Sequence, residues 1–86
     1  MTVDQTSILA YDHIKPHLGI KQNIVYDTIK NHPYVSNEDI SNILGWRINT
    51  VTPRVKELRE YGSVMRGGYG ISKRTGKKVN LWIVKE

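Results

Sequence analysis

A short stretch near the middle of the chain carries side chains that can hydrogen-bond to nucleobase edges and to phosphates. An arginine can pair with both acceptors of guanine, and an asparagine can pair with the edge of adenine. The side chains of these types are Arg47, Asn49, Thr50, Thr52, Arg54 and Lys56. No acidic residue stands among them, and the first acids follow at Glu57 and Glu60. The stretch is therefore a candidate for reading a nucleic-acid sequence.

A second group of candidate residues is purely basic and lies close to the C-terminus. It consists of Lys73, Arg74, Lys77 and Lys78. The chain has 13 basic and 8 acidic residues, a net charge of +5. Residues 1–61 contain seven of each sign, whereas residues 62–86 contain six basic residues and one acid, so the excess charge lies in this last part. Such a patch suits phosphate groups or an adjoining minor groove, although a charged tip that protects a sheet edge, or a solvated basic tail, is the structural alternative.

The first group is expected on a helix of about residues 49–61, and its apolar stripe consists of Val51, Val55 and Leu58. Asn49 or Thr52 is expected to cap its start, and Gly62 is expected to end it. Pro53 fits a first turn, where the missing N–H has almost no partner. The polar face then points away from the core, as a reading face or as an ordinary solvated face with pairs such as Arg54–Glu57.

Two or three helices are expected before this one. Ser36 and Asp39 can form a capping box for a helix that ends at Gly45, with Ile40, Ile43 and Leu44 facing inward. Residues 21–31 carry the helical stripe Ile24, Val25, Thr28 and Ile29, which His32 and Pro33 stop. Residues 1–5 are expected to form a loose terminus, and Ser7 can cap a short helix with Ile8, Ala10, Tyr11 and Ile14 that Pro16 and Gly19 close.

After Gly62 the spacing of apolar residues changes from a helical period of 3.6 residues to the two-residue alternation of a strand. Residues 64–69 and 79–84 predict two strands, and Gly67 and Gly68 suggest a bulge in the first. Trp46 and Trp82 are expected in the core, and stacking of Tyr69 or Trp82 on unpaired bases is the alternative. The sequence thus predicts one α+β domain over residues 1–86: a winged helix-turn-helix with three to four helices, followed by a hairpin, the wing, over about residues 63–85.

Several classes of protein have little support in the sequence. The chain has no cysteine, and no apolar run approaches the ~20 residues that span a bilayer. His13 and His17 have a spacing that can bind metal, but Pro16 interrupts the register and no third ligand is near. The GGYG segment lacks the rest of a dinucleotide fingerprint. We therefore expect a cytoplasmic protein that is not an enzyme and that has no metal, cofactor or membrane partner.

The chain resembles a family of small winged-helix proteins of bacteriophages and prophages. The resemblance rests on TSILAYDHIK, on GWRINTVTPRVKEL, and on the wing segment SKRTGKKVNLWIV. It implies DNA binding through Asn49, Thr50, Thr52 and Arg54, with the wing on the backbone. Ser63 departs from the family, which has an apolar residue there, and Ile71 and Ser72 stand where basic residues are expected.

Together these features predict a sequence-specific protein that binds double-stranded DNA and regulates phage transcription at the host nucleoid. The recognition helix would enter the major groove and the wing would lie on the backbone. The alternative is a winged-helix module whose basic wing binds and inhibits an acidic host protein. The helix expected from Ser7 would pack across the domain or across a second copy, forming a homodimer.

Overall fold

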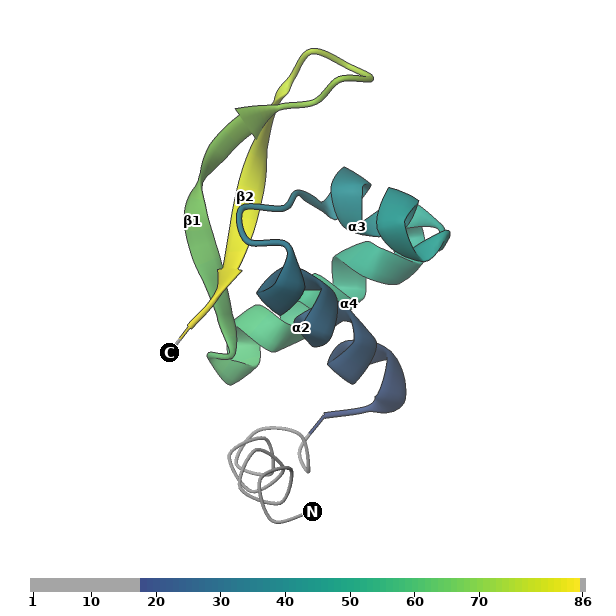
Figure 1. Ribbon diagram of the computed structural model, residues 1–86, viewed down its shortest axis with the longest axis vertical. Coiled ribbons are helices and arrows are strands. Elements are labelled where there is room, and N and C mark those ends of the chain that lie inside the picture. The colour runs from purple at the N-terminus through teal and green to yellow at the C-terminus, as the bar shows by residue number, and fades with distance from the viewer. Residues whose placement is uncertain (1–17, 86) are drawn as a thin grey trace.

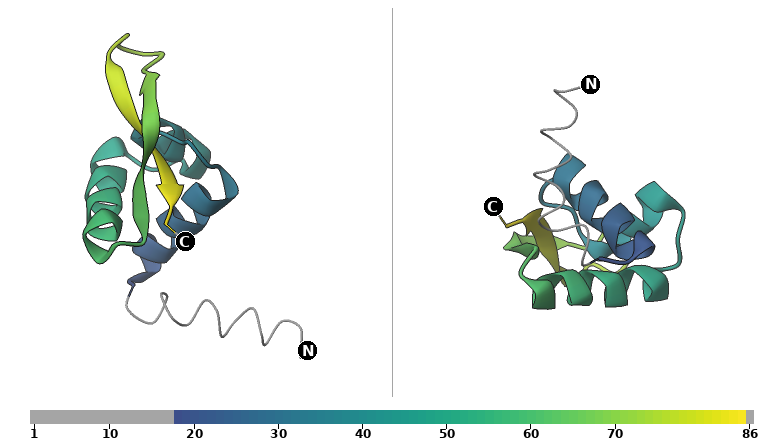
Figure 2. Two further views of the ribbon diagram at one scale, coloured as in Figure 1. Left: turned by 90° about the vertical axis from the view of Figure 1, so that its left-hand side faces the viewer. Right: turned by 90° about the horizontal axis from the view of Figure 1, so that it is seen from below.

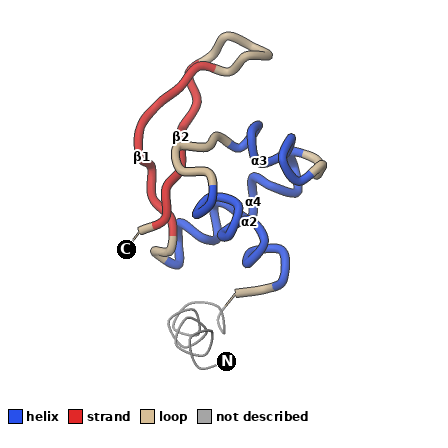
Figure 3. Tube along the Cα trace, viewed as in Figure 1, coloured by secondary structure: helices blue, strands red, loops and turns tan. Residues whose placement is uncertain are grey.

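The computed structural model describes residues 18–85, so the helix expected from Ser7 and the terminus of residues 1–5 lie outside the described part. The elements in chain order are α2 (Ile20–Asn31), α3 (Asn37–Leu44), α4 (Ile48–Tyr61), β1 (Val64–Ile71) and β2 (Lys78–Val84). Figure 1 shows the three helices packed together beside a hairpin whose tip projects past them. Figure 3 shows the helices in blue, the strands in red and the connecting loops in tan.

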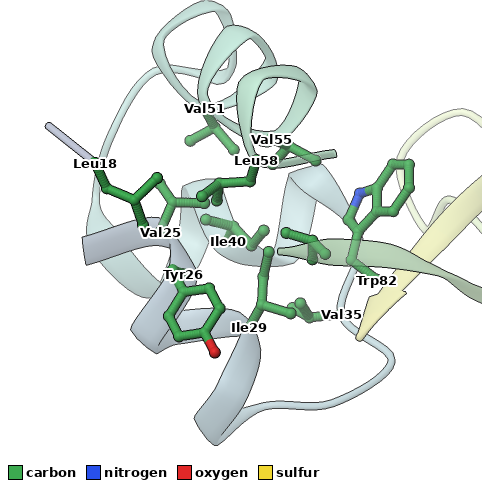
Figure 4. Close-up of a cluster of buried hydrophobic side chains, with 11 residues drawn as sticks. Leu18, Val25, Tyr26, Ile29, Val35, Ile40, Val51, Val55, Leu58 and Trp82 are labelled. Carbon is green, nitrogen blue, oxygen red and sulfur yellow. The ribbon is translucent and has the colours of Figure 1, made fainter. Parts of the chain in front are cut away.

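A single cluster of buried side chains lies where the three helices meet β2 (Figure 4). Val25 and Ile29 come from α2, Ile40 comes from α3, and the expected stripe Val51, Val55 and Leu58 comes from α4. Each such side chain contributes about 1.5 to 3 kcal/mol when it leaves water. Trp82 of β2 is only 3% exposed, which confirms it as a core residue and removes it as a platform for unpaired bases. Trp46 packs against the same cluster, partly buried.

The hairpin is attached to the helices through β2. The backbone N–H of Trp82 donates to the carbonyl of Val35 at 2.7 Å, and the two residues form a short antiparallel bridge, with Val35 lying between α2 and α3. On its other side β2 pairs antiparallel with β1. The strand β2 therefore lies between the α2–α3 connection and the outer strand β1, which fixes the wing to the domain over part of its length.

Local capping signals explain where α3 begins and ends. The Ser36 hydroxyl accepts from the backbone N–H of Asp39 at 3.1 Å, and Asp39 accepts in return from the N–H of Ser36. Gly45 ends the helix with φ of +69°, a conformation that costs glycine little. The expected inward position of Ile43 is wrong: its side chain is 47% exposed, because the eight-residue helix buries only the narrower face centred on Ile40.

The helix α4 begins at Ile48, one residue before the expected start, and neither Asn49 nor Thr52 caps it. Arg47 occupies the cap position without a side-chain hydrogen bond. Pro53 consequently falls in the second turn rather than the first, and it deprives the carbonyl of Asn49 of its usual N–H donor. At the other end Gly62, with φ of +82°, donates to the carbonyls of the last turn as expected.

The connection from α4 into the wing accommodates Ser63, the residue that departs from the resembled family. The backbone N–H of Ser63 donates to the carbonyl of Leu58 at 2.9 Å, and its own carbonyl accepts from Lys85 at 2.9 Å. Its side chain is buried. Ser63 therefore closes the end of α4 and ties the start of β1 to the end of β2.

The wing contains the bulge that its glycines suggested. The register pairs Arg66 with Trp82 and then Gly68 with Leu81, so Gly67 is the extra residue. Because residues opposite each other share a face of a sheet, Arg66, Tyr69 and Ile71 lie on the same face as Trp82, Asn80 and Lys78. That face is the one that carries Trp82 toward the helices. The bulge thus places Tyr69 on the helix side of the wing, on the same face as Arg66.

Candidate nucleic-acid interface

The outward face of α4 presents polar side chains next to the wing. Asn49, Thr52 and Lys56 are exposed, and Arg47 is exposed at the cap. Thr50 is half-buried. Figure 2 (left) shows α4 and the hairpin lying side by side, so that both elements border the same side of the domain. Thr52 and Lys56 line hollows together with residues of the wing, so the structure brings these two candidate residues next to it.

Arg54 lies on the other flank of α4, facing α2. Its Nε donates to Oε1 of Glu57 at 2.8 Å, and its terminal nitrogen donates to Oε2 at 2.9 Å. Gln22 of α2 donates to the same Glu57 carboxylate at 2.7 Å. The bonds from Arg54 and then from Gln22 lower the pKa of Glu57, and the bond to Glu57 raises the pKa of Arg54. Arg54 is thus engaged within the domain, as in the Arg54–Glu57 pairing weighed above.

The wing tip is a closed turn built around Ser72. The backbone N–H of Ser72 donates to the carbonyl of Lys77 at 2.8 Å, and Gly76 donates to the carbonyl of Ser72 at 2.9 Å. Gly76 has φ of +72°, which a glycine adopts readily. Lys73 and Lys77 are exposed on this turn, and neither forms an ion pair with another residue of the range 18–85.

Glu38 of α3 holds the wing tip from the side. The Ser72 hydroxyl lies 2.9 Å from both carboxylate oxygens of Glu38. The same hydroxyl oxygen accepts hydrogen bonds from the backbone N–H groups of Arg74 and Thr75. The Arg74 Nε lies 3.4 Å from Glu38 Oε2, although its side chain stays 75% exposed. Ser72, at a position where a basic residue was expected, is thus buried, and its hydroxyl accepts hydrogen bonds from the turn.

Lys78 begins β2 directly after the turn, where it pairs with Ile71, the last residue of β1. Its Nζ is 4.0 Å from the ring centroid of Tyr69, and the guanidinium of Arg66 is 4.5 Å from the same centroid. Tyr69 remains 50% exposed. Two cations therefore share one aromatic ring on the helix side of the wing, and each is attracted by about 0.5 to 1 kcal/mol at an exposed site.

The sequence interpretation omitted two arginines that face the same region. Arg66 is one, and Arg59 of α4 is the other, with its guanidinium 4.8 Å from the ring centroid of Trp82. A helical wheel of α4 places Arg59 on the same flank as Thr52, so the sequence did indicate that Arg59 could face the same surface. Arg66 carried no such signal, because its face depends on its pairing with Trp82, which the cross-strand register decides.

Residues 18–85 show neither a membrane-spanning helix nor a cluster of metal ligands. No helix between residues 18 and 85 has the length and apolar character needed to cross a bilayer. Within the same residues, no group of three histidine or acidic side chains is placed to hold a metal ion.

Comparisons with known proteins bear on the fold. No family model and no curated protein sequence matches the chain. The chain is similar to a solved structure described as Streptococcus pneumoniae FabT in complex with DNA, with a TM-score of 0.64 and 19% sequence identity. The similarity covers 99% of this chain and 61% of the FabT chain, so the present chain spans less than two thirds of that protein. Three helices followed by an antiparallel hairpin, in the arrangement of that structure, confirm the predicted winged helix-turn-helix fold.

Proposed function

We propose that the chain binds double-stranded DNA in a sequence-specific way and regulates transcription. In this proposal α4 enters the major groove with Asn49, Thr52 and Lys56, while Lys73 and Lys77 of the wing contact the phosphate backbone. The observation that carries the proposal is the polar face of α4, which stays exposed next to the wing, together with Lys73 and Lys77 of the wing turn, which form no ion pair with another residue of the range 18–85.

Two further observations support this proposal. The FabT structure, which shares the fold, is described as a complex with DNA. The motif GWRINTVTPRVKEL resembles winged-helix proteins of bacteriophages, which favours a regulator of phage or prophage genes acting at the host nucleoid. Arg47, Thr50, Arg54 and Arg74 remain proposed contacts as well, but Arg54 and Arg74 would first have to leave Glu57 and Glu38.

The proposal is tested by selecting bound duplexes from a random pool and then measuring affinity for the selected sequence over a range of salt concentrations. If about five cations contact phosphates, the slope of log affinity against log salt should be about −4 to −5. Symmetric half-sites in the selected duplexes would indicate that two copies bind together, as the predicted homodimer requires. Absence of duplex binding, or binding that salt does not weaken, would overturn the proposal.

The alternative partner is an acidic host protein, since a basic wing attracts either kind of polyanion. A pull-down from host lysate with and without nuclease separates the two. Proteins that stay bound after nuclease treatment, together with failure to bind any duplex, would support the protein-binding function in place of DNA binding. Loss of bound material on nuclease treatment would support the DNA-binding function.

A further inference from the structure

Two hollows lie between α4 and the wing, one toward each end of the helix. The first, of about 450 Å³, is lined by Thr52 from α4, by the start of α3, and by Tyr69, Lys78 and Asn80 from the wing. The second, of about 510 Å³, is lined by basic side chains of both elements and by the acid Glu60, which border the last half of α4. Its basic lining residues are Lys56, Arg59, Arg66 and Lys85.

Two cation–aromatic contacts link side chains of the second hollow to side chains of the first. Arg59 lines the second hollow and lies 4.8 Å from the ring of Trp82, which lines the first. Arg66 lines the second hollow and lies 4.5 Å from the ring of Tyr69, which also lines the first. The two hollows therefore lie next to each other along α4, and together they are here named the α4–wing groove.

The charge of this groove is predominantly positive and is not neutralised inside the domain. Lys56, Arg59, Arg66 and Lys78 form no ion pair with any other residue of the range 18–85. Two carboxylates border the groove: Glu60 is exposed at one end, and Glu38 at the other end is engaged by Ser72 and Arg74. The groove thus offers five cations, Lys85 included, against one unengaged acid.

We propose that the α4–wing groove binds the sugar-phosphate backbone of one DNA strand, with Arg59, Arg66 and Lys78 as phosphate contacts. This inference rests on the proposed function. If α4 occupies the major groove and the wing reaches the adjoining minor groove, the single backbone that separates those two grooves must lie between the two elements. That is where the structure places these cations.

The aromatic rings give the groove cations a fixed position before DNA binds. Tyr69 holds Arg66 and Lys78, and Trp82 holds Arg59. Side chains that are already ordered lose less entropy on binding, and the planar fork of arginine matches phosphate oxygens. Tyr69 thus acts as a positioning residue, and the groove cations bind any sequence alike because phosphates carry no base identity.

The test measures binding of a random-sequence duplex to the full chain over a range of salt concentrations. Arg59→Gln and Arg66→Gln each remove one proposed contact, which should lower the affinity about 5- to 10-fold at 0.1 M salt and make the slope shallower by about 0.9. Lys21→Gln on α2 makes the same change of charge outside the groove and is the control. Arg59→Lys keeps the charge and should keep the slope, which separates a phosphate contact from packing on Trp82.

Tyr69 provides a second readout that does not change the charge. Tyr69→Phe keeps the ring and should bind as the unaltered chain does, whereas Tyr69→Leu should weaken binding by about two- to five-fold with the slope unchanged. If the unaltered chain binds duplex DNA but Arg59→Gln and Arg66→Gln behave like Lys21→Gln, the groove proposal is overturned and the DNA-binding function stands. If the unaltered chain binds no duplex, both are overturned.

Discussion

The carboxylate of Glu38 and the hydroxyl of Ser72 meet at 2.9 Å across 34 residues of sequence. Glu38 belongs to α3, the first helix of the helix-turn-helix, and Ser72 opens the turn at the wing tip. Ser72 is only 3% exposed, and its hydroxyl also accepts from two backbone N–H groups of the turn. One side chain therefore closes the wing tip and fixes it to the body of the domain.

Ser72→Ala should loosen the wing tip while leaving the core intact. The substitution removes the bond to Glu38 and leaves the N–H groups of Arg74 and Thr75 without their acceptor, and such a loss costs about 1 to 3 kcal/mol where the groups are buried. Amide hydrogen exchange should accelerate at Gly76 and be unchanged at Ile40, since local opening is independent of global unfolding. Lys73→Ala, at an exposed neighbour, is the matched control, and equal exchange at Gly76 in both variants would contradict the prediction.

Asn49→Ala should reduce discrimination between DNA sequences, whereas Lys77→Ala should weaken all sequences alike. Asn49 is exposed on the first turn of α4, where a side-chain amide can pair with a base edge for about 1 to 3 kcal/mol of discrimination. Lys77 is exposed on the wing turn and would contact phosphates. The measurement is the ratio of affinities for selected and random duplexes. The same change of that ratio in both variants would show that the two elements do not divide these tasks.

Gly67→Ala should destabilise the domain, and Gly68→Ala should not. A Cβ at Gly67 would lie 2.9 Å from the Tyr34 ring and 3.0 Å from the Ile83 methyl group, which is too close without movement. Overpacking of this kind costs about 1 to 3 kcal/mol. A Cβ at Gly68 meets nothing within 4 Å, so the smaller loss of chain entropy should stabilise slightly, by about 0.4 to 1 kcal/mol. Urea unfolding of both variants measures the difference, and an equal effect would disprove the close packing at Gly67.

Glu57→Gln should make the stability less dependent on acid pH. The pKa of Glu57 is lowered chiefly by the bond from Arg54 and then by that from Gln22. A lowered pKa in the folded state stabilises fully above the unfolded value of about 4.3, and this contribution is lost as pH falls through the lower folded value. The pair is about one third exposed, so the effect should be about 0.2 to 1 kcal/mol.

Urea unfolding at pH 6 and at pH 3 checks this prediction. The stability difference between the unaltered chain and Glu57→Gln should be present at pH 6 and shrink at pH 3. The same comparison with Glu60→Gln is the control, because Glu60 has no ion-pair partner within residues 18–85. A difference that stays constant with pH would show that the Arg54–Glu57 bonds contribute nothing to folding.

The sequence by itself determined the features whose causes lie within a few residues. Ser36 and Asp39 begin α3, Gly62 ends α4, and the apolar spacing from Val51 to Leu58 identifies the buried face of the recognition helix. Capping bonds and helical stripes depend on neighbours at most four positions away, so they can be read directly from the order of the residues. The winged fold followed from the order of these local elements.

Only the tertiary structure decided which cations remain available to a ligand. Arg54 is held by Glu57 and Arg74 by Glu38, whereas Arg59 and Arg66 rest on aromatic rings and stay unpaired with any acid of the described residues. The physical reason is that packing between distant segments brings Glu38 to Arg74 and Trp82 to Arg59, whereas Glu57 lies only three residues from Arg54. In addition, the bulge in β1 moves every later side chain, including that of Tyr69, to the opposite face. Residue types supplied the charges, and the folded arrangement decided which of them face one groove.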